Sequence, residues 1–237
     1  GGERSPSAEL VLRAVLRRIA LPDEPIRPRR AFLAAFACFG ALRTLARRIG
    51  EIAASGDVKL TELALAVLAV CACEVVGRRE IEADEVHNPD GCVSVLVSVI
   101  KREPLSTFVH VHCLAVLQRL SLRERLQLKM IDLGIVEWIL QTLEHLGPPD
   151  IVNSIESNWH NQSPGGTSVS PDFSIEFASA LLMNLVSRNA GRRRCSENRG
   201  FQILSLFMEH PNPQVRAHVS GALCQLLGSA TVRAEAR

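Results

Sequence analysis

The stretch "FASALLMNLVSRNAGRRRC", residues 177–195, runs from an apolar segment with one asparagine into three consecutive arginines. Its apolar part has three relatives in the chain, each with a small residue two positions before a central leucine. The four segments are "LALAVLAVCA" (63–72), "HCLAVLQRLS" (112–121), "FASALLMNLV" (177–186) and "HVSGALCQLL" (218–227). The aligned leucines are Leu68, Leu117, Leu182 and Leu223, which are spaced 49, 65 and 41 residues apart. Recurrence of this kind predicts a chain built from repeated structural units.

A second marker has a similar spacing. Gly91, Gly134 and Gly200 each open an apolar segment, and they lie 43 and 66 residues apart. Both markers indicate a unit of about 42 residues, which is the spacing of armadillo-type helical repeats. Both also show one long interval, and the segment 147–172, rich in Ser, Pro, Gly and Asn, lies within it. This segment predicts a flexible surface insertion between two repeat helices.

The four apolar segments predict helices that are buried between neighbouring helices. A helix that is apolar on all sides cannot stand alone in water, so the adjacent repeats must cover it. The small residues would allow close approach of the helices; they are Ala66, Ala115, Ala180 and Gly221. Charged residues follow at the turns, and cations there favour the negative C-terminal end of a helix. We interpret Arg192, Arg193 and Arg194 as such a helix-end feature, with a specific anion site as the alternative.

Nothing in the sequence alternates as a strand does, so we predict an all-α fold. It is a right-handed superhelical solenoid of about four to five armadillo-type repeats. Residues 1–28 predict an N-terminal helix and a proline-rich connector, and residues 29–237 predict the repeat domain. Gly50, Gly77 and the segment 189–191 are interpreted as helix breakers. The helices of the repeat domain are predicted near 32–49, 59–76, 92–101, 104–122, 124–133, 135–146, 173–188, 192–199, 201–209 and 214–227.

Composition argues against catalysis and against a metal or cofactor. The seven cysteines are an odd number scattered through apolar runs, which favours free thiols in a reducing compartment. There is no CxxC pair, and His110 and His112 beside Cys113 would point to different sides of a helix. The sequence also lacks a glycine-rich phosphate loop and a nucleophile elbow. We therefore predict a protein that is not an enzyme and binds no cofactor.

Charge and hydropathy argue against nucleic acid and membrane partners. The net charge is only +2, although the chain has 24 Arg and 3 Lys, and the arginine clusters have no interleaved aromatic residues for base stacking. The longest apolar run, Leu63–Cys73, is too short to cross a bilayer. We predict neither nucleic-acid binding nor membrane insertion.

A peptide groove is a further possibility for this fold. In importin- and catenin-like armadillo proteins, an asparagine ladder on successive third helices grips an extended peptide, and tryptophans one turn earlier make pockets. Asn184 falls at the ladder position, but the equivalent residues are Val70, Arg119 and Gln225, and the tryptophan positions hold small residues. An adaptor that binds extended peptides, for transport or cargo recognition, is therefore the alternative function. We expect Arg119, Asn184, Gln225 and the arginines 192–194 to face a protein partner.

The insertion suggests regulation by phosphorylation. Ser163 and Ser170 each precede a proline, which is the minimal pattern for proline-directed kinases, and both lie in the predicted loop.

Three stretches of the sequence together resemble one known family. "FASALLMNLVSRNAGRRRC" and "HVSGALCQLLGSATVRAEAR", together with "LAVLQRLSLRERLQLKMIDLGIVEWILQTL" (114–143), resemble the C-terminal armadillo region of the LisH-domain-containing armadillo repeat-containing protein nine family. The similarity runs from about residue 60 to residue 237. Residues 1–50 match poorly, the insertion at 147–172 is longer than the family leads us to expect, and no LisH dimerisation motif is present.

The resemblance implies a non-catalytic scaffold at the ciliary basal body or axoneme that supports cilium assembly or stability. Its partners would be other ciliary or microtubule-associated proteins, with tubulin among the candidates. Its location would be the cytoplasm and cytoskeleton, at the cilium and basal body.

Overall fold

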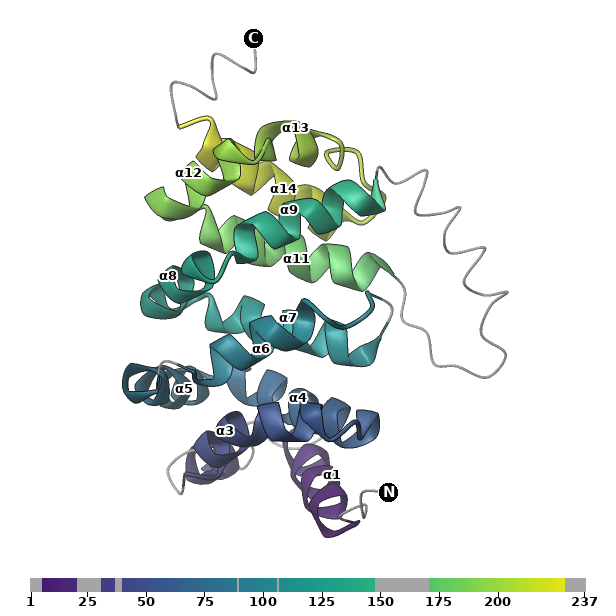
Figure 1. Ribbon diagram of the computed structural model, residues 1–237, viewed down its shortest axis with the longest axis vertical. Helices are drawn as coiled ribbons and strands as arrows, with labels where there is room; N and C mark the ends of the chain where they lie inside the picture. The colour runs from purple at the N-terminus through teal and green to yellow at the C-terminus, as the bar shows by residue number, and fades with distance from the viewer. Residues whose placement is uncertain are drawn as a thin grey trace, which may run out of the picture.

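A computed structural model describes residues 6–20, 31–36, 40–88, 90–105, 107–147 and 171–228, and every regular element in these ranges is a helix (Figure 1). The named helices are α1 (Pro6–Ala20), α3 (Ala41–Ala54), α4 (Val58–Cys73), α5 (Val75–His87), α6 (Cys92–Ile100), α7 (Phe108–Leu120), α8 (Glu124–Asp132), α9 (Ile135–Leu146), α11 (Pro171–Leu185), α12 (Asn189–Glu197), α13 (Gly200–Ser205) and α14 (Pro213–Leu226).

The helices stack as repeats along the long axis of the molecule. Helices α5, α6 and α7 form one repeat, α8, α9 and α11 the next, and α12, α13 and α14 the last. Before them, the short helical segment 31–36 and helices α3 and α4 occupy the place of an earlier repeat. Helix α1 packs on α4. The third helices α4, α7, α11 and α14 contact one another in that order. The predicted all-α armadillo-type solenoid is confirmed.

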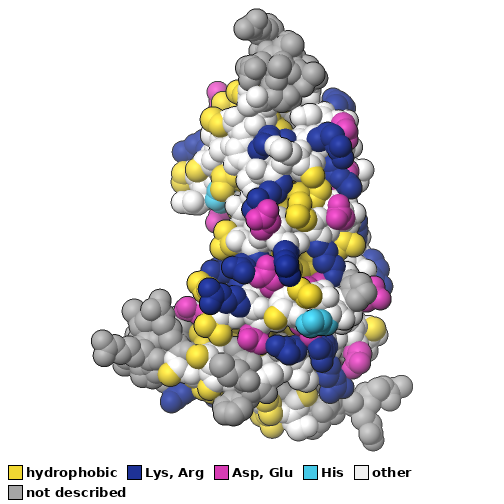
Figure 2. All heavy atoms as spheres, turned by 90° about the vertical axis from the view of Figure 1, so that its left-hand side faces the viewer, with side chains coloured by type: hydrophobic (Ala, Val, Ile, Leu, Met, Phe, Trp, Pro, Cys, Tyr) yellow, Lys and Arg dark blue, Asp and Glu magenta, His cyan; other side chains and the backbone are white. Residues whose placement is uncertain are grey.

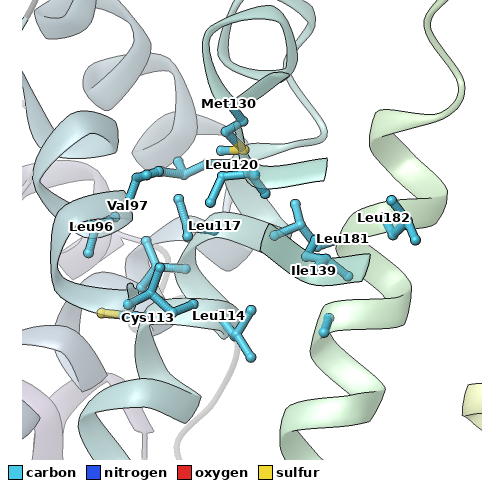
Figure 3. Close-up of a cluster of buried hydrophobic side chains, with 14 of the residues drawn as sticks. Leu96, Val97, Cys113, Leu114, Leu117, Leu120, Met130, Ile139, Leu181 and Leu182 are labelled. Atoms are coloured by element: carbon cyan, nitrogen blue, oxygen red, sulfur yellow. The ribbon is translucent and has the colours of Figure 1, made fainter. Parts of the chain in front are cut away.

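The core follows the aligned leucines through the stack. Leu68, Leu117 and Leu182 are fully buried, and Leu223 at the C-terminal end is 5% exposed. Figure 3 shows how apolar side chains of α6, α7, α8, α9 and α11 converge around Leu117. The inner third helices α7 and α11 are thus covered by helices of their own repeats and by a third helix on either side, whereas α4 packs between α1 and α7 and α14 packs on α11. This mutual burial explains how such apolar helices exist in one fold.

Helix α5 is absent from the helices predicted from the sequence, because the sequence pattern indicates Gly77 as a helix breaker. Gly77 instead lies in the first turn of α5, where it is buried. A Cβ atom at this position would overlap the carbonyl oxygen of Cys71 in the preceding helix. The glycine is therefore required for the sharp turn from α4 into α5, and it does not end a helix.

Two other predicted boundaries are also wrong. Gly50 lies inside α3, which continues to Ala54, and the segment 189–191 forms the first turn of α12. The single helix predicted over 32–49 is two, because a break precedes α3 at Gly40, whose φ of 73° is left-handed.

Parts of the predicted domain plan lie outside the described residues. The connector within 1–28 and most of the insertion at 147–172 belong to this group, as do Ser163 and Ser170. Phosphorylation of these serines stays a prediction.

Candidate functional site

The row of third helices carries the residues predicted to face a protein partner, so its partly exposed positions form the candidate site. Two residues after each aligned leucine lie Val70, Arg119, Asn184 and Gln225, and all four are half-buried. We call these the ladder positions. Between the small residue and the ladder position, the four helices carry one charged side chain, Arg119.

The polar ladder side chains reach back to the preceding third helix. Arg119 Nε lies 2.8 Å from Cys73 Sγ of α4 and donates to it. Asn184 Nδ2 donates to Ser121 Oγ, at the end of α7, over 2.8 Å. Gln225 Nε2 lies 3.5 Å from the carbonyl oxygen of Met183 in α11. The polar groups of Arg119, Asn184 and Gln225 therefore join neighbouring repeats. These are the same groups that could contact a bound peptide.

A polar network that the sequence did not predict surrounds Asn184. The buried side chain of Gln127 donates from Nε2 to the Asn184 carbonyl oxygen over 3.3 Å, and its Oε1 accepts from Arg188 Nε over 2.6 Å. Arg188 also pairs with Glu124 at 2.9 Å. The network joins α8 to the end of α11 and satisfies a glutamine that would be costly to bury alone. Its only sequence signal is a set of polar residues next to apolar helix ends.

The three consecutive arginines have three different environments. Arg192 Nη1 donates to the carbonyl oxygens of Val186 and Ser187 at the end of α11, over 3.1 and 3.0 Å, which is the helix-end contact that the sequence predicts. Arg194 Nη1 pairs with Glu137 of α9 over 2.9 Å and is 30% exposed. Arg193 is 72% exposed and lies 3.7 Å from Glu197. The fold thus uses Arg192 and Arg194 for packing and leaves Arg193 at the surface.

His110 and the buried thiols have the properties of core residues. His110 is fully buried, its Nδ1 lies 3.3 Å from Ser174 Oγ, and its ring centroid lies 5.8 Å from that of Trp138. Burial lowers the pKa of His110 to about 4 and raises the pKa of Cys71 and of Cys195 to about 12. Within the described ranges, no group of three or more His, Cys, Asp or Glu side chains could hold a metal ion.

Comparison with known proteins shows a resemblance to one family. The family described as "LisH domain-containing protein ARMC9, ARM repeats" matches residues 162–237. The LisH domain-containing protein ARMC9 of Xenopus tropicalis is 31% identical over 144 residues, which are 60% of this chain and 15% of that protein. The same-named protein of Homo sapiens is 29% identical over 147 residues, 61% of this chain and 15% of its own length. The family resemblance is confirmed.

The fold has counterparts among solved structures. The crystal structure of an engineered protein superposes with a TM-score of 0.63 at 17% identity, over 94% of this chain and 45% of its own. This likeness shows the fold alone. The match to the ARMC9 repeats spans about 15% of the length of the curated relatives. The armadillo fold and the ARMC9 resemblance support a protein-interaction scaffold and point to a non-enzymatic repeat protein.

Among the described residues, no single helix has the length and apolar character needed to cross a bilayer. Helices α4 and α5 together meet the criteria of length and composition, but they are bent by 111° where they join.

Proposed function

We propose that this chain is a non-catalytic scaffold of the ciliary basal body or axoneme, where its repeats bind ciliary or microtubule-associated proteins and support cilium assembly or stability. Two observations support the proposal: the resemblance to the ARMC9 repeats and the continuous stack of third helices. Such a stack offers a long surface from few residues, which suits a protein that holds several partners. The cytoplasm and cytoskeleton, at the cilium, are the location that follows.

The residues at the ladder positions favour a scaffold over a peptide adaptor. An adaptor for basic peptides needs repeated free asparagines above an acidic surface. Here Asn184 Nδ2 donates to Ser121, the neighbouring ladder position holds the cation Arg119, and the third-helix segments between the small and ladder residues hold no acid. A basic peptide would therefore meet neither the repeated asparagines nor the negative charge that it requires.

Proximity labelling in cells tests the ciliary proposal. The chain is fused to a labelling enzyme and expressed in ciliated cells, with the same cells after deciliation as the control. We expect labelled basal-body and axonemal proteins in the ciliated cells and their loss from the axonemal fraction in the control. Labelling confined to general cytosolic proteins, equal in both samples, would exclude a ciliary role.

A peptide titration separates the scaffold from the adaptor. We expect a fluorescent Lys/Arg-rich localisation peptide to show no saturable binding to the purified chain. Asn184→Ala should lower the free energy of unfolding by about 1 kcal/mol, because Ser121 Oγ loses the hydrogen bond from Asn184 Nδ2, whereas Gln127 keeps its bond to the main-chain carbonyl oxygen of residue 184. Tight peptide binding that Asn184→Ala abolishes without loss of stability would establish the adaptor function instead.

A further inference from the structure

Two buried histidines flank the first turns of helix α11, which lies between α7 of its own side of the stack and α14 of the last repeat (Figure 1). His110, on α7, is fully buried and contacts Ser174 of α11. His210, in the turn between α13 and α14, is 1% exposed, and its Nε2 lies 3.7 Å from Oδ1 of Asp172 on α11. We call His110 and His210 the flanking histidines. They hold the start of α11 from both neighbouring repeats.

The contacts of His110 require a neutral imidazole. The hydroxyl of Ser174 donates to the carbonyl oxygen of Leu105 over 3.0 Å, so it accepts from Nδ1 of His110, 3.3 Å away. Nδ1 therefore carries the proton of the neutral ring, and an added proton would occupy Nε2. That atom is buried and has no hydrogen-bond partner among the described residues. A charged His110 would thus hold a buried N–H group without an acceptor, which is costly.

No opposite charge compensates a proton on His110. Burial alone lowers its pKa to about 4. Helix α6, which packs on α7, has no charged residue, and α4, with Lys59 and Glu62, packs on the side of α7 away from α11 (Figure 1). The carboxylates of α9, of α11 and of the turn before α7 contact other groups; the pairs are Glu103–Thr107, Glu137–Arg194, Glu144–Arg199, Asp172–His210 and Glu176–Asn212.

His210 also requires a neutral ring. Its Nδ1 accepts from the main-chain N–H of Asn212 over 3.1 Å, so the proton of the neutral ring is on Nε2. Asn212 is the N-cap of α14, and a second proton on the ring would occupy Nδ1 and remove this acceptor at the start of the helix. Burial is the main cause that lowers the pKa of His210. The carboxylate of Asp172 opposes it, and Arg216, whose Nη1 donates to the His210 carbonyl oxygen over 2.7 Å, adds to it.

The other side of the stack is joined by contacts of a different kind. The first helices of the repeats, α5, α8 and α12, lie there, and Figure 2 shows Lys and Arg side chains beside Asp and Glu on this side. Arg123 donates to Glu82 over 2.7 Å, and Arg188 pairs with Glu124 over 2.9 Å. Arginine and carboxylate groups generally keep their charges near neutral pH, whereas histidine changes its charge between pH 5 and 8. Mild acid should therefore act on the start of α11 before it acts on the first helices.

We propose that the start of α11 is an acid-sensitive conformational switch, which opens when the flanking histidines take up protons from the solvent. In the closed form the rings are buried and neutral, and Ser174 and Ile175 of α11 are covered. In the open form water solvates both imidazolium rings, and these two residues become accessible. Below pH 6.5 the open form binds protons that the closed form does not, so opening becomes more favourable as the pH falls toward the folded-state pKa of His110, about 4.

Hydrogen–deuterium exchange at pH 7 and at pH 5 tests the switch, with each rate divided by the intrinsic rate at that pH. Protection of residues 173–179 is expected to fall by at least about twentyfold, the factor for one histidine whose pKa is 6.5 when open and about 4 when closed. Helix α3 lies in the part of the chain before the first histidine, His87, and its protection should change by less than about threefold. Equal losses in α3 and in residues 173–179 would overturn the inference.

The variant His110→Asn/His210→Asn removes the titration and retains the polar contacts, because the amide of asparagine can donate or accept where each Nδ1 does. Protection of residues 173–179 should then fall by less than about threefold between the two pH values. The matched control is His87→Asn/His145→Asn, which removes two exposed histidines and should keep the loss of about twentyfold. An undiminished loss in both variants would assign the effect to other groups and overturn the switch.

Circular dichroism checks that each variant is folded. If the double variant of the flanking histidines fails to fold, the single variants His110→Asn and His210→Asn take its place. Each should show a smaller loss of protection than the unchanged chain, because each removes one of the two titrating rings. A full loss in both single variants would contradict the inference.

Discussion

At the scale of the residue, Gly191 is needed for close packing of the backbone, although its residue type predicts a helix breaker. Like Gly77, it lies nine residues after an aligned leucine, and an added Cβ atom would overlap a carbonyl oxygen of the preceding third helix, that of Leu185. Both glycines allow the chain to turn sharply and begin the next first helix at once. The sequence marks them as special but does not say whether they end a helix or begin one.

We predict that Gly191→Ala lowers the free energy of unfolding by about 2 kcal/mol, because the backbone must shift to admit the methyl group. The control is Gly50→Ala, where the added Cβ would meet only the side chain of Val95, at 3.3 Å. Alanine gains helix propensity there, so a change within about 1 kcal/mol is expected. Urea unfolding measures both, and equal effects would show that the close approach at Gly191 has no energetic role.

His110 predicts a pH dependence of stability. Its pKa is about 4 in the folded chain and near 6.5 when unfolded. Between these pH values the unfolded chain binds a proton that the folded chain does not, so stability falls as the pH falls. From pH 7 to pH 5 the chain should lose about 2 kcal/mol more than His110→Leu, since the leucine cannot titrate. Parallel losses in urea unfolding would show that His110 is not held neutral.

At the scale of the element, α12 is held to α9 by the pair of Arg194 and Glu137, which lie 2.9 Å apart with side chains 30% and 26% exposed. Arg194 contacts Glu137 Oε1, while the buried Oε2 has no hydrogen-bond partner among the described residues. We predict a coupling energy of about 1 kcal/mol from a double-mutant cycle with alanine. The pair of Arg193 and Glu197, with both side chains more than 60% exposed, should give less than about 0.5 kcal/mol. A stronger coupling in the exposed pair would contradict this assignment of roles.

The elements also show what the sequence could and could not predict. Apolar third helices were predicted because their pattern is repeated and unlike any surface segment. Helix α5 was missed because it is charged, begins directly after α4 and carries a glycine in its first turn. Start and stop signals fail where two helices meet without a loop, since a close backbone approach then decides the residue type.

The candidate site was predictable in position and not in partners. The ladder positions follow from alignment on the leucines, so Arg119, Asn184 and Gln225 could be named from the sequence. Their contacts to Cys73, Ser121 and Met183 depend on the offset between neighbouring third helices, which no residue type encodes. Nor could the sequence separate Arg193 from Arg192 and Arg194, because the contrast lies in which carbonyl or carboxylate each one meets.

At the scale of the whole molecule, the account depends on a linear stack in which each repeat contacts only its neighbours. The third helices touch in chain order, and the described helices α3 and α4 are separated from α12 to α14 by two intervening repeats. A stack of this kind loosens locally, since a perturbed repeat weakens the adjacent interface and leaves distant repeats unchanged.

Hydrogen–deuterium exchange of Val219→Ala tests this claim most directly. Val219 is buried in α14, and its truncation leaves a small cavity in the last repeat. We predict faster amide exchange in α12, α13 and α14, a smaller increase in α11, and unchanged exchange in α3 to α6. An equal increase throughout the chain would mean that one cooperative core joins all the helices, and it would contradict the stacked-repeat account.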